Sequence, residues 1–258
     1  LRIEAEVAIR EGAKHLILSD KEVSEKKVQI PMALAIGSIN SRLTSLGIRG
    51  FASINIQTSE ILDTHSFAVL LGVGATTINP YIAIDSIFQR YQKKLFEKMS
   101  FEECVKRYIK SIDNGLLKIM SKMGISVLSA YRGGCNFEAV GLSRSVVAEY
   151  FPGMVSRISG IGISGIEKKI KELHAKAFQS NVLILPIGGI YKYRKNGETH
   201  QYQGKLIHML QSAVTSNSYK VYKKYSQGIH DLPVINLRDL VDFKKLKKSI
   251  NIKEVESI

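Results

Sequence analysis

The chain of 258 residues is 45% hydrophobic, 8% aromatic and 23% charged. This composition excludes disordered, collagen-like and coiled-coil classes, and the length suffices for one large α/β domain, or for one domain and part of another. The formal net charge of +14 favours an anionic partner in principle. Most lysines, however, occur in pairs on predicted helix surfaces with few interleaved aromatic residues, so we do not expect nucleic acid as a partner.

The cysteines and the apolar stretches indicate in which cellular compartment the chain is expected. Only Cys104 and Cys135 occur, without a CxxC motif or histidines at metal-ligand spacing, which predicts a reducing, cytoplasmic location and no structural zinc. The most apolar stretch, 67–84, contains an Asn-Pro pair, so we predict a helix, a glycine stop and a buried strand there, and no membrane span. The N-terminus has no Met and no signal-peptide pattern, so we expect the chain to be part of a longer one.

Helical and strand patterns alternate along the first half of the chain. We predict helices at 3–11, 31–47, 61–74, 85–98 and 101–123, and strands at 15–20, 51–59, 75–84 and 126–131. Strands that are separated by helices need crossover connections, which favour a mostly parallel sheet with helices on both faces. Both an open doubly wound sheet and part of a barrel satisfy this pattern.

Polar residues follow the predicted strands, where ligand sites of parallel sheets lie. They are Asp20, Glu60, Asn79, Tyr81 and Arg132. If the strands are neighbours in one sheet, these side chains converge on a ligand. The alternative is that they cap helices and tie loops, as polar residues at strand ends often do.

The regular alternation ends near Pro152. We predict a boundary close to residue 155, followed by an irregular, mainly helical region. It contains a helix at 165–178, an apolar VLILP segment, a tyrosine-rich stretch, a helix at about 204–217 and the segments YKVYKKYSQ and LRDLVDF. This is too irregular for a second complete α/β domain.

The segment 160–165, GIGISG, matches the dinucleotide pattern G-x-G-x-x-G by letter. That pattern needs a preceding strand and an acid about 20 residues further on. The preceding SRIS does not suggest a strand, and NVLILP ends without an acid. We therefore interpret Ser164 and Glu167 as a capping box at the start of the next helix.

Cys135 is the better candidate for a reactive thiol. It follows two glycines and is the first residue of CNFEAVGL, which we predict to begin a helix with Cys135 or Asn136 near its cap, and a helix N-terminus lowers the pKa of a thiol. A small packing residue is the alternative. Local rules explain the nearby glycines, since Gly124 ends the preceding helix and Gly133-Gly134 form a turn. They do not explain why the polar residues of this segment are Lys122, Tyr131, Arg132 and Glu138.

The segment 116–142, LLKIMSKMGISVLSAYRGGCNFEAVGL, resembles the end of the central domain in the large chain of glutamate synthase. The resemblance continues in family order through AIREGAKHLILSD (8–20), IPMALAIGSINSRLTSLGIR (30–49), DTHSFAVLLGVGATTINPYIAIDSI (63–87), SRISGIGISGIE (156–167) and LRDLVDF (237–243). Departures are Gly134 and Cys135, where the family usually has Ala and Gln, and THS around His65.

The resemblance implies a fragment of an enzyme that transfers the amide nitrogen of glutamine to 2-oxoglutarate and reduces the product to glutamate. It assigns 1–155 to the later part of the central domain and 156–258 to the lead-in of the FMN-binding domain, without the TIM-type barrel itself. FMN and a 3Fe-4S cluster belong to other parts of the family's large chain. No catalytic, cofactor-binding or metal-binding residue of the family maps onto this sequence, so we expect no cofactor in this chain.

On this basis we expect a structural role, in which the segment positions the glutaminase and FMN sites and helps to enclose the ammonia path. Lys122, Tyr131, Arg132 and Glu138 are then buried or interfacial polar residues. The implied partners are the remaining domains of the large chain and a reductase small subunit. The alternative is a binding module for a small anion or a flavin without catalysis, built on the strand-end residues Asp20, Asn79, Tyr81 and Arg132.

Overall fold

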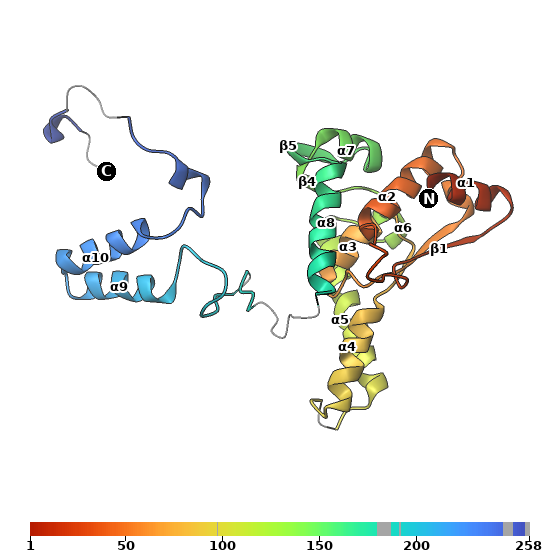
Figure 1. Cartoon of the computed structure of the whole chain (residues 1–258), viewed down its shortest axis with the longest axis horizontal. Coiled ribbons are helices and arrows are strands. Elements are labelled where there is room, and N and C mark those ends of the chain that lie inside the picture. Colours follow the sequence, from red (N-terminus) through yellow and green to blue (C-terminus); the bar gives the residue numbers. More distant parts are fainter. Residues whose placement is uncertain (97, 180–186, 191, 245–249, 256–258) are drawn as a thin grey trace. The chain divides into compact units, whose positions relative to one another are not determined.

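The computed structural model describes residues 1–96, 98–179, 187–190, 192–244 and 250–255 (Figure 1). Two compact units divide the chain, Leu1–Ser180 and Asn181–Ile258. The boundary expected near residue 155 therefore lies inside the first unit. The assignment of 1–155 and 156–258 to two domains stays a prediction.

The first unit is built on a parallel sheet of order β1-β2-β3 with helices between successive strands. Its elements are α1 (Arg2–Arg10), β1 (His15–Ser19), α2 (Met32–Ser45), the 3-10 helix η1 (Arg49–Phe51), β2 (Ser53–Gln57), α3 (Thr64–Gly72) and β3 (Thr77–Asn79). These bounds agree within a few residues with the predicted elements up to residue 74. The predicted α/β class with parallel strands is confirmed.

The two faces of this sheet differ. On β2, Ile54 and Ile56 are fully buried and belong to one apolar cluster with side chains of α1, α2, α3 and α5. Successive side chains of a strand point to opposite faces, and on the opposite face Ile17 is 72% exposed at the centre of β1. Within the described residues of this unit, the helices pack on one face of the sheet, so the prediction of helices on both faces is wrong for this part of the chain.

The remaining elements of the unit are α4 (Tyr81–Gln92), α5 (Phe101–Lys122), α6 (Leu128–Tyr131), β4 (Glu138–Leu142), α7 (Arg144–Tyr150), β5 (Val155–Ile161) and α8 (Ile163–Ala177). A second, two-stranded parallel sheet pairs β4 with β5, with two register shifts. Helix α7 connects these strands and packs on α2.

Three predicted elements are wrong. The predicted strand at 126–131 is the short helix α6, the predicted helix after Cys135 is strand β4, and the predicted strand at 75–84 ends at Asn79. Pro80 is the N-cap of α4, which agrees with the fact that proline cannot donate a ladder hydrogen bond. Gly141 has φ +79°, which a helix cannot accommodate, and β5 supplies the pairing partner of this segment.

The prediction for the glycine-rich segment 160–165 is also wrong in two respects. SRIS is part of strand β5, and α8 begins at Ile163 with Gly162 as an N-cap that forms no side-chain hydrogen bond. No capping box exists here, because Gly162 has no side chain that could accept a hydrogen bond, and Glu167 pairs with Lys171 at 2.5 Å. At Gly160 a Cβ atom would collide with the Gly141 backbone, so this glycine permits the close approach of β4 and β5.

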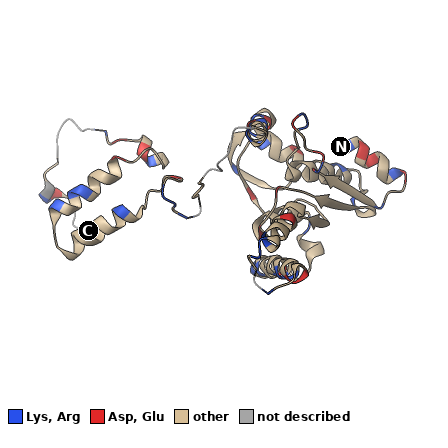
Figure 2. Ribbon diagram, turned by 60° about the horizontal axis from the view of Figure 1, so that its bottom comes forward, with Lys and Arg blue, Asp and Glu red and all other residues tan. Residues whose placement is uncertain are grey.

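The second unit contains a helical hairpin. Its elements are α9 (Gly204–Thr215), α10 (Tyr219–His230), and the 3-10 helices η2 (Leu237–Leu240) and η3 (Ile252–Glu254). Leu206 and Ala213 are its buried residues in α9, and Leu206 contacts Gly228 of α10. The apolar VLILP segment lies outside the described residues. In Figure 2 lysines and arginines are spread along several helices of each unit.

Candidate functional site

Asp20 organises the carboxyl ends of the first two strands. It follows β1 and is only 7% exposed. Its Oδ2 accepts hydrogen bonds from the Thr58 hydroxyl (2.8 Å), the Ser59 amide (2.8 Å) and the Ser59 hydroxyl (3.0 Å). Its Oδ1 is buried and has no hydrogen-bond partner among the described residues. Three charge-assisted hydrogen bonds to one oxygen tie the end of β1 to the end of β2.

Tyr81 and Asn79 lie at the same edge. Tyr81 opens α4, and burial together with the Asp20 carboxylate raises the pKa of its hydroxyl. The Lys21 ammonium lies 5.0 Å from the centre of the Tyr81 ring, a cation–π geometry. The Asn79 carbonyl accepts a hydrogen bond from the Thr58 amide (3.0 Å). The carboxyl ends of β1, β2 and β3 thus form one polar edge, as parallel pairing requires. Whether this edge binds a ligand stays a prediction.

Arg132 does not join this edge. It lines a cavity of about 480 Å³ with Lys14, Ala52 and Thr76, which immediately precede β1, β2 and β3. Arg132 therefore lies at the amino ends of the strands, opposite to Asp20. The predicted convergence with Asp20 and Tyr81 is wrong, because it required a strand ending at Tyr131, and that segment is helix α6.

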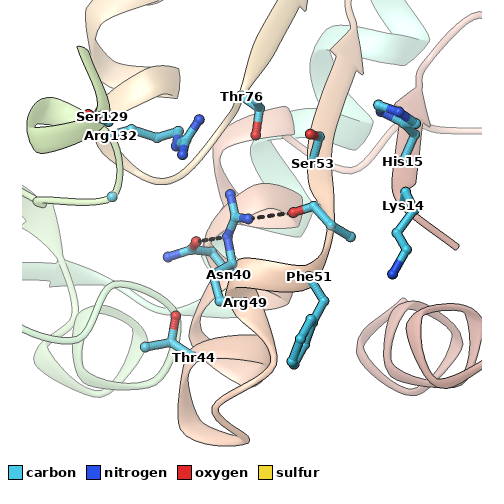
Figure 3. A pocket seen from close by; sticks show the side chains of 13 residues that line it. Lys14, His15, Asn40, Thr44, Arg49, Phe51, Ser53, Thr76, Ser129 and Arg132 are labelled. Carbon is cyan, nitrogen blue, oxygen red and sulfur yellow. Dashed lines mark hydrogen bonds between the residues drawn. The ribbon is translucent and has the colours of Figure 1, made fainter. Parts of the chain in front are cut away.

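Arg49 is the second arginine of this cavity, and the sequence offered no motif that singled it out. Its Nε donates to Asn40 Oδ1 (2.7 Å), its Nη1 to the Ala52 carbonyl (2.8 Å) and its Nη2 to the Gly74 carbonyl (2.8 Å). All three acceptors are neutral. Figure 3 shows the Arg132 side chain extending toward the guanidinium of Arg49. Burial, and the nearby positive charge of Arg132, lower the pKa of Arg49.

The loop that carries Arg132 is anchored to the end of α3. Tyr131 is 1% exposed, and its hydroxyl donates to the Ala68 carbonyl (3.2 Å). The Gly133 amide donates to the Leu71 carbonyl (3.1 Å), and the Cys135 amide donates to the Gly72 carbonyl (3.0 Å). The last carbonyls of a helix lack partners inside the helix, so this loop satisfies two of them. The segment is a structural joint within the first unit.

Side-chain packing also stabilises this joint. The Phe137 ring meets the Tyr131 ring edge-on, with centroids 6.3 Å apart. It also lies against Gly72, where a Cβ atom would collide with it. Cys135 has φ +48° and is followed by an extended segment. Burial raises the pKa of its thiol, so the predicted lowering by a helix N-terminus is wrong.

The other two residues of the predicted joint are more exposed. Lys122 is an exposed residue in the last turn of α5. Glu138 opens β4, and its carboxylate pairs with Arg157 of β5 at 3.3 Å, with both side chains partly in solvent. Their role at a domain interface stays a prediction.

No cluster of three or more potential metal ligands occurs among the described residues. Across the same part of the chain, no helix combines the length and the apolar character that a membrane span requires.

Comparison with known proteins identifies the family. Residues 1–143 match the glutamate synthase central domain. The chain is similar to the glutamate synthase [NADPH] large chain of Azospirillum brasilense, with 52% identity over 258 residues that cover all of this chain and 17% of that protein. The large chain of Bacillus subtilis (strain 168) is 38% identical over 98% of this chain and 17% of its own length. The ferredoxin-dependent glutamate synthase of Spinacia oleracea is 35% identical over 98% of this chain and 16% of its own length.

The chain thus spans about one sixth of the length of these relatives. The matches run through the whole chain and include the joint at 116–142, the segment that most resembled the family. The chain belongs to the glutamate synthase family, and residues 1–143 correspond to its central domain.

Proposed function

We propose that this chain is the part of a glutamate synthase large chain that holds the amide-releasing site and the flavin site at a fixed separation. The parent reaction transfers the amide nitrogen of glutamine to 2-oxoglutarate and reduces the product to glutamate. The chain contributes packing surfaces to this reaction and no reacting group. Its partners are the remaining domains of the large chain, with a reductase subunit as a further one, and its location is cytoplasmic.

The observation that carries this proposal is the open face of the first sheet. Parallel sheets occur almost entirely with both faces covered, but Ile17 at the centre of β1 is 72% exposed, and on the same face Thr77 of β3 is also exposed, with the half-buried Asn55 of β2 between them. A parallel sheet with one open face needs another layer. On our proposal, a neighbouring domain of the same large chain provides that layer.

The internal hydrogen bonds and packing of the first unit support a positioning role. The joint around Tyr131 connects α6, the end of α3 and the start of β4 through buried hydrogen bonds and aromatic packing. A segment that holds two distant sites must not deform when a domain docks on it. Sealing also matters, because ammonia that escapes into water is protonated and lost to the second reaction.

Substitution of Ile17 tests the proposal in an intact large chain that contains this sequence. Ile17→Asp places a charge on the open face, and we expect fewer glutamate molecules formed per glutamine hydrolysed, because an uncompensated charge disrupts a dry interface. The 258-residue chain alone should lose at most about 1 kcal/mol of unfolding free energy, the span of strand propensities.

Ile17→Val is the matched control, because it keeps the apolar surface and the β-branched shape. It should leave the ratio of glutamate formed to glutamine hydrolysed unchanged. An unchanged ratio in Ile17→Asp, in an enzyme that still hydrolyses glutamine, would refute the assignment of this face to a domain interface.

A further inference from the structure

The cavity at the amino ends of the strands is lined by basic and neutral residues. Lys14, Arg49 and Arg132 line it together with the ring of His15 and the hydroxyl groups of Ser53 and Thr76. None of its described lining residues is aspartate or glutamate. A fully buried positive charge is normally paired with an acid; Arg49 and Arg132 are half-buried, and the described lining of their cavity offers none.

Arg49 is held in place before any ligand arrives. A guanidinium has five N–H donors, and three of them are used by the hydrogen bonds to Asn40, Ala52 and Gly74. One N–H on each of Nη1 and Nη2 remains for another acceptor. A fixed fork of this kind loses little entropy when it binds a planar or tetrahedral oxyanion.

Arg132 supplies the second charge of the cavity. Its side chain forms no hydrogen bond or ion pair with any described residue, and it points toward Arg49 (Figure 3). Burial, together with the nearby charge of Arg132, lowers the pKa of Arg49. Two like charges that share one cavity repel each other. An anion bound between them is attracted to both, and these two attractions offset the repulsion.

We propose that this cavity is a binding site for a small oxyanion of the carboxylate or phosphate class, held between the guanidinium groups of Arg49 and Arg132. Lys14 adds a third positive charge at its rim. The oxyanion is either a free small molecule or an acidic side chain from another segment of a longer large chain. This inference does not depend on the proposed function, because it rests on the cavity alone.

Titration calorimetry of the 258-residue chain with inorganic phosphate, and separately with succinate, tests the site. Measurements at one fixed ionic strength separate site binding from general screening. We expect saturable binding of at least one probe with one site per chain. Absence of saturable binding by both probes overturns the proposal.

Arg132→Gln is the decisive variant, because the Arg49 anchor and the fold remain. Loss of one charge-assisted contact should weaken the binding about 10- to 100-fold. Arg132→Lys keeps the charge without the fork, so its affinity should lie between those of the parent chain and Arg132→Gln. Arg90→Gln is the matched control, since Arg90 is an exposed residue of α4 outside the cavity. If Arg90→Gln weakens binding as much as Arg132→Gln does, binding follows net charge and the proposal fails.

The same titration of an intact large chain distinguishes the two sources of the oxyanion. Retained binding identifies a free small molecule as the ligand. Loss of binding in the longer chain, with binding present in the 258-residue chain, identifies an acidic side chain of the large chain as the occupant. Either result supports the site, and each assigns its ligand.

Discussion

Removal of the Tyr131 hydroxyl isolates one bond of the joint. In Tyr131→Phe the ring stays against Phe137, and only the hydrogen bond to the Ala68 carbonyl (3.2 Å) is lost. The site is buried, with Tyr131 1% exposed, so water cannot replace the lost donor. We expect the unfolding free energy to fall by about 0.5–1.5 kcal/mol.

Removal of the whole ring has a larger effect. Tyr131→Ala leaves a cavity beside Ala68, Leu71 and Met120, the buried residues with which the ring is clustered. Truncation of a buried aromatic side chain costs about 3–5 kcal/mol, a large share of the about 5–15 kcal/mol that stabilises a typical domain. Each kcal/mol should lower the Tm by about 2–4 °C for a unit of this size.

Calorimetry combined with urea unfolding monitored by circular dichroism measures both changes. Calorimetry is needed because the two units of the chain can unfold in separate transitions. Tyr91→Phe is the matched control, since Tyr91 is 38% exposed and its hydroxyl has no hydrogen bond to the described residues; we expect a change below about 0.5 kcal/mol. If Tyr131→Phe and Tyr131→Ala both behave like Tyr91→Phe, the joint does not stabilise the first unit.

Three further predictions concern neighbouring positions. Gly72→Ala should destabilise the first unit by about 1–3 kcal/mol, because the added methyl group displaces the Phe137 ring, and thermal unfolding measures the loss. Asp63 caps α3, and its hydrogen bonds to the Ser66 side chain and amide lower its pKa. The stability that the Asp63 carboxylate adds to the folded chain is therefore present above the unfolded pKa of about 3.9, and it is lost as the pH falls through the folded pKa. Asp63→Ala should cost about 1 kcal/mol at pH 7 and less at low pH, whereas Asp63→Asn should keep the cap without this pH dependence, as urea titrations at several pH values will test. Glu138→Gln should change the unfolding free energy of the 258-residue chain by less than about 1 kcal/mol, since its ion pair is exposed; a larger loss there would show that the pair is more than a surface contact.

Local patterns predicted the early elements well. Helices α1, α2 and α3 and strands β1 and β2 follow from apolar periodicity and from glycines that end helices. Such signals depend on neighbours within one or two turns. The same reasoning placed Asp20, Asn79 and Tyr81 at one edge, because parallel strands that are joined by helices bring their carboxyl ends together.

The misassigned segments depend on distant contacts. The segment 126–131 has an apolar run that suits a strand, but Tyr131 is anchored by Ala68, 63 residues earlier, and the segment closes into α6. The segment 138–142 is a strand because β5 pairs with it. Arg132 consequently lies at the amino edge of the sheet and not at the carboxyl edge, where the predicted strand would have placed it.

The arginine cavity shows why part of the candidate site could not be predicted from the sequence. The position of the Arg49 guanidinium is fixed by hydrogen bonds to three acceptors at separate points of the chain, Asn40, Ala52 and Gly74, none of which is charged. No local pattern marks an arginine whose partners are backbone carbonyls and one amide. Only the folded chain places it beside Arg132.

The sequence by itself determined the α/β class, the alternating elements of the first half and the family resemblance, because periodicity, helix stops and motif order are properties of nearby residues. Tertiary structure decided the secondary structure of 126–142, the edge of the sheet on which Arg132 lies and the burial of Tyr131. The physical reason is that short apolar segments are compatible with both helix and strand. For these segments, long-range hydrogen bonds and packing select the state that is formed.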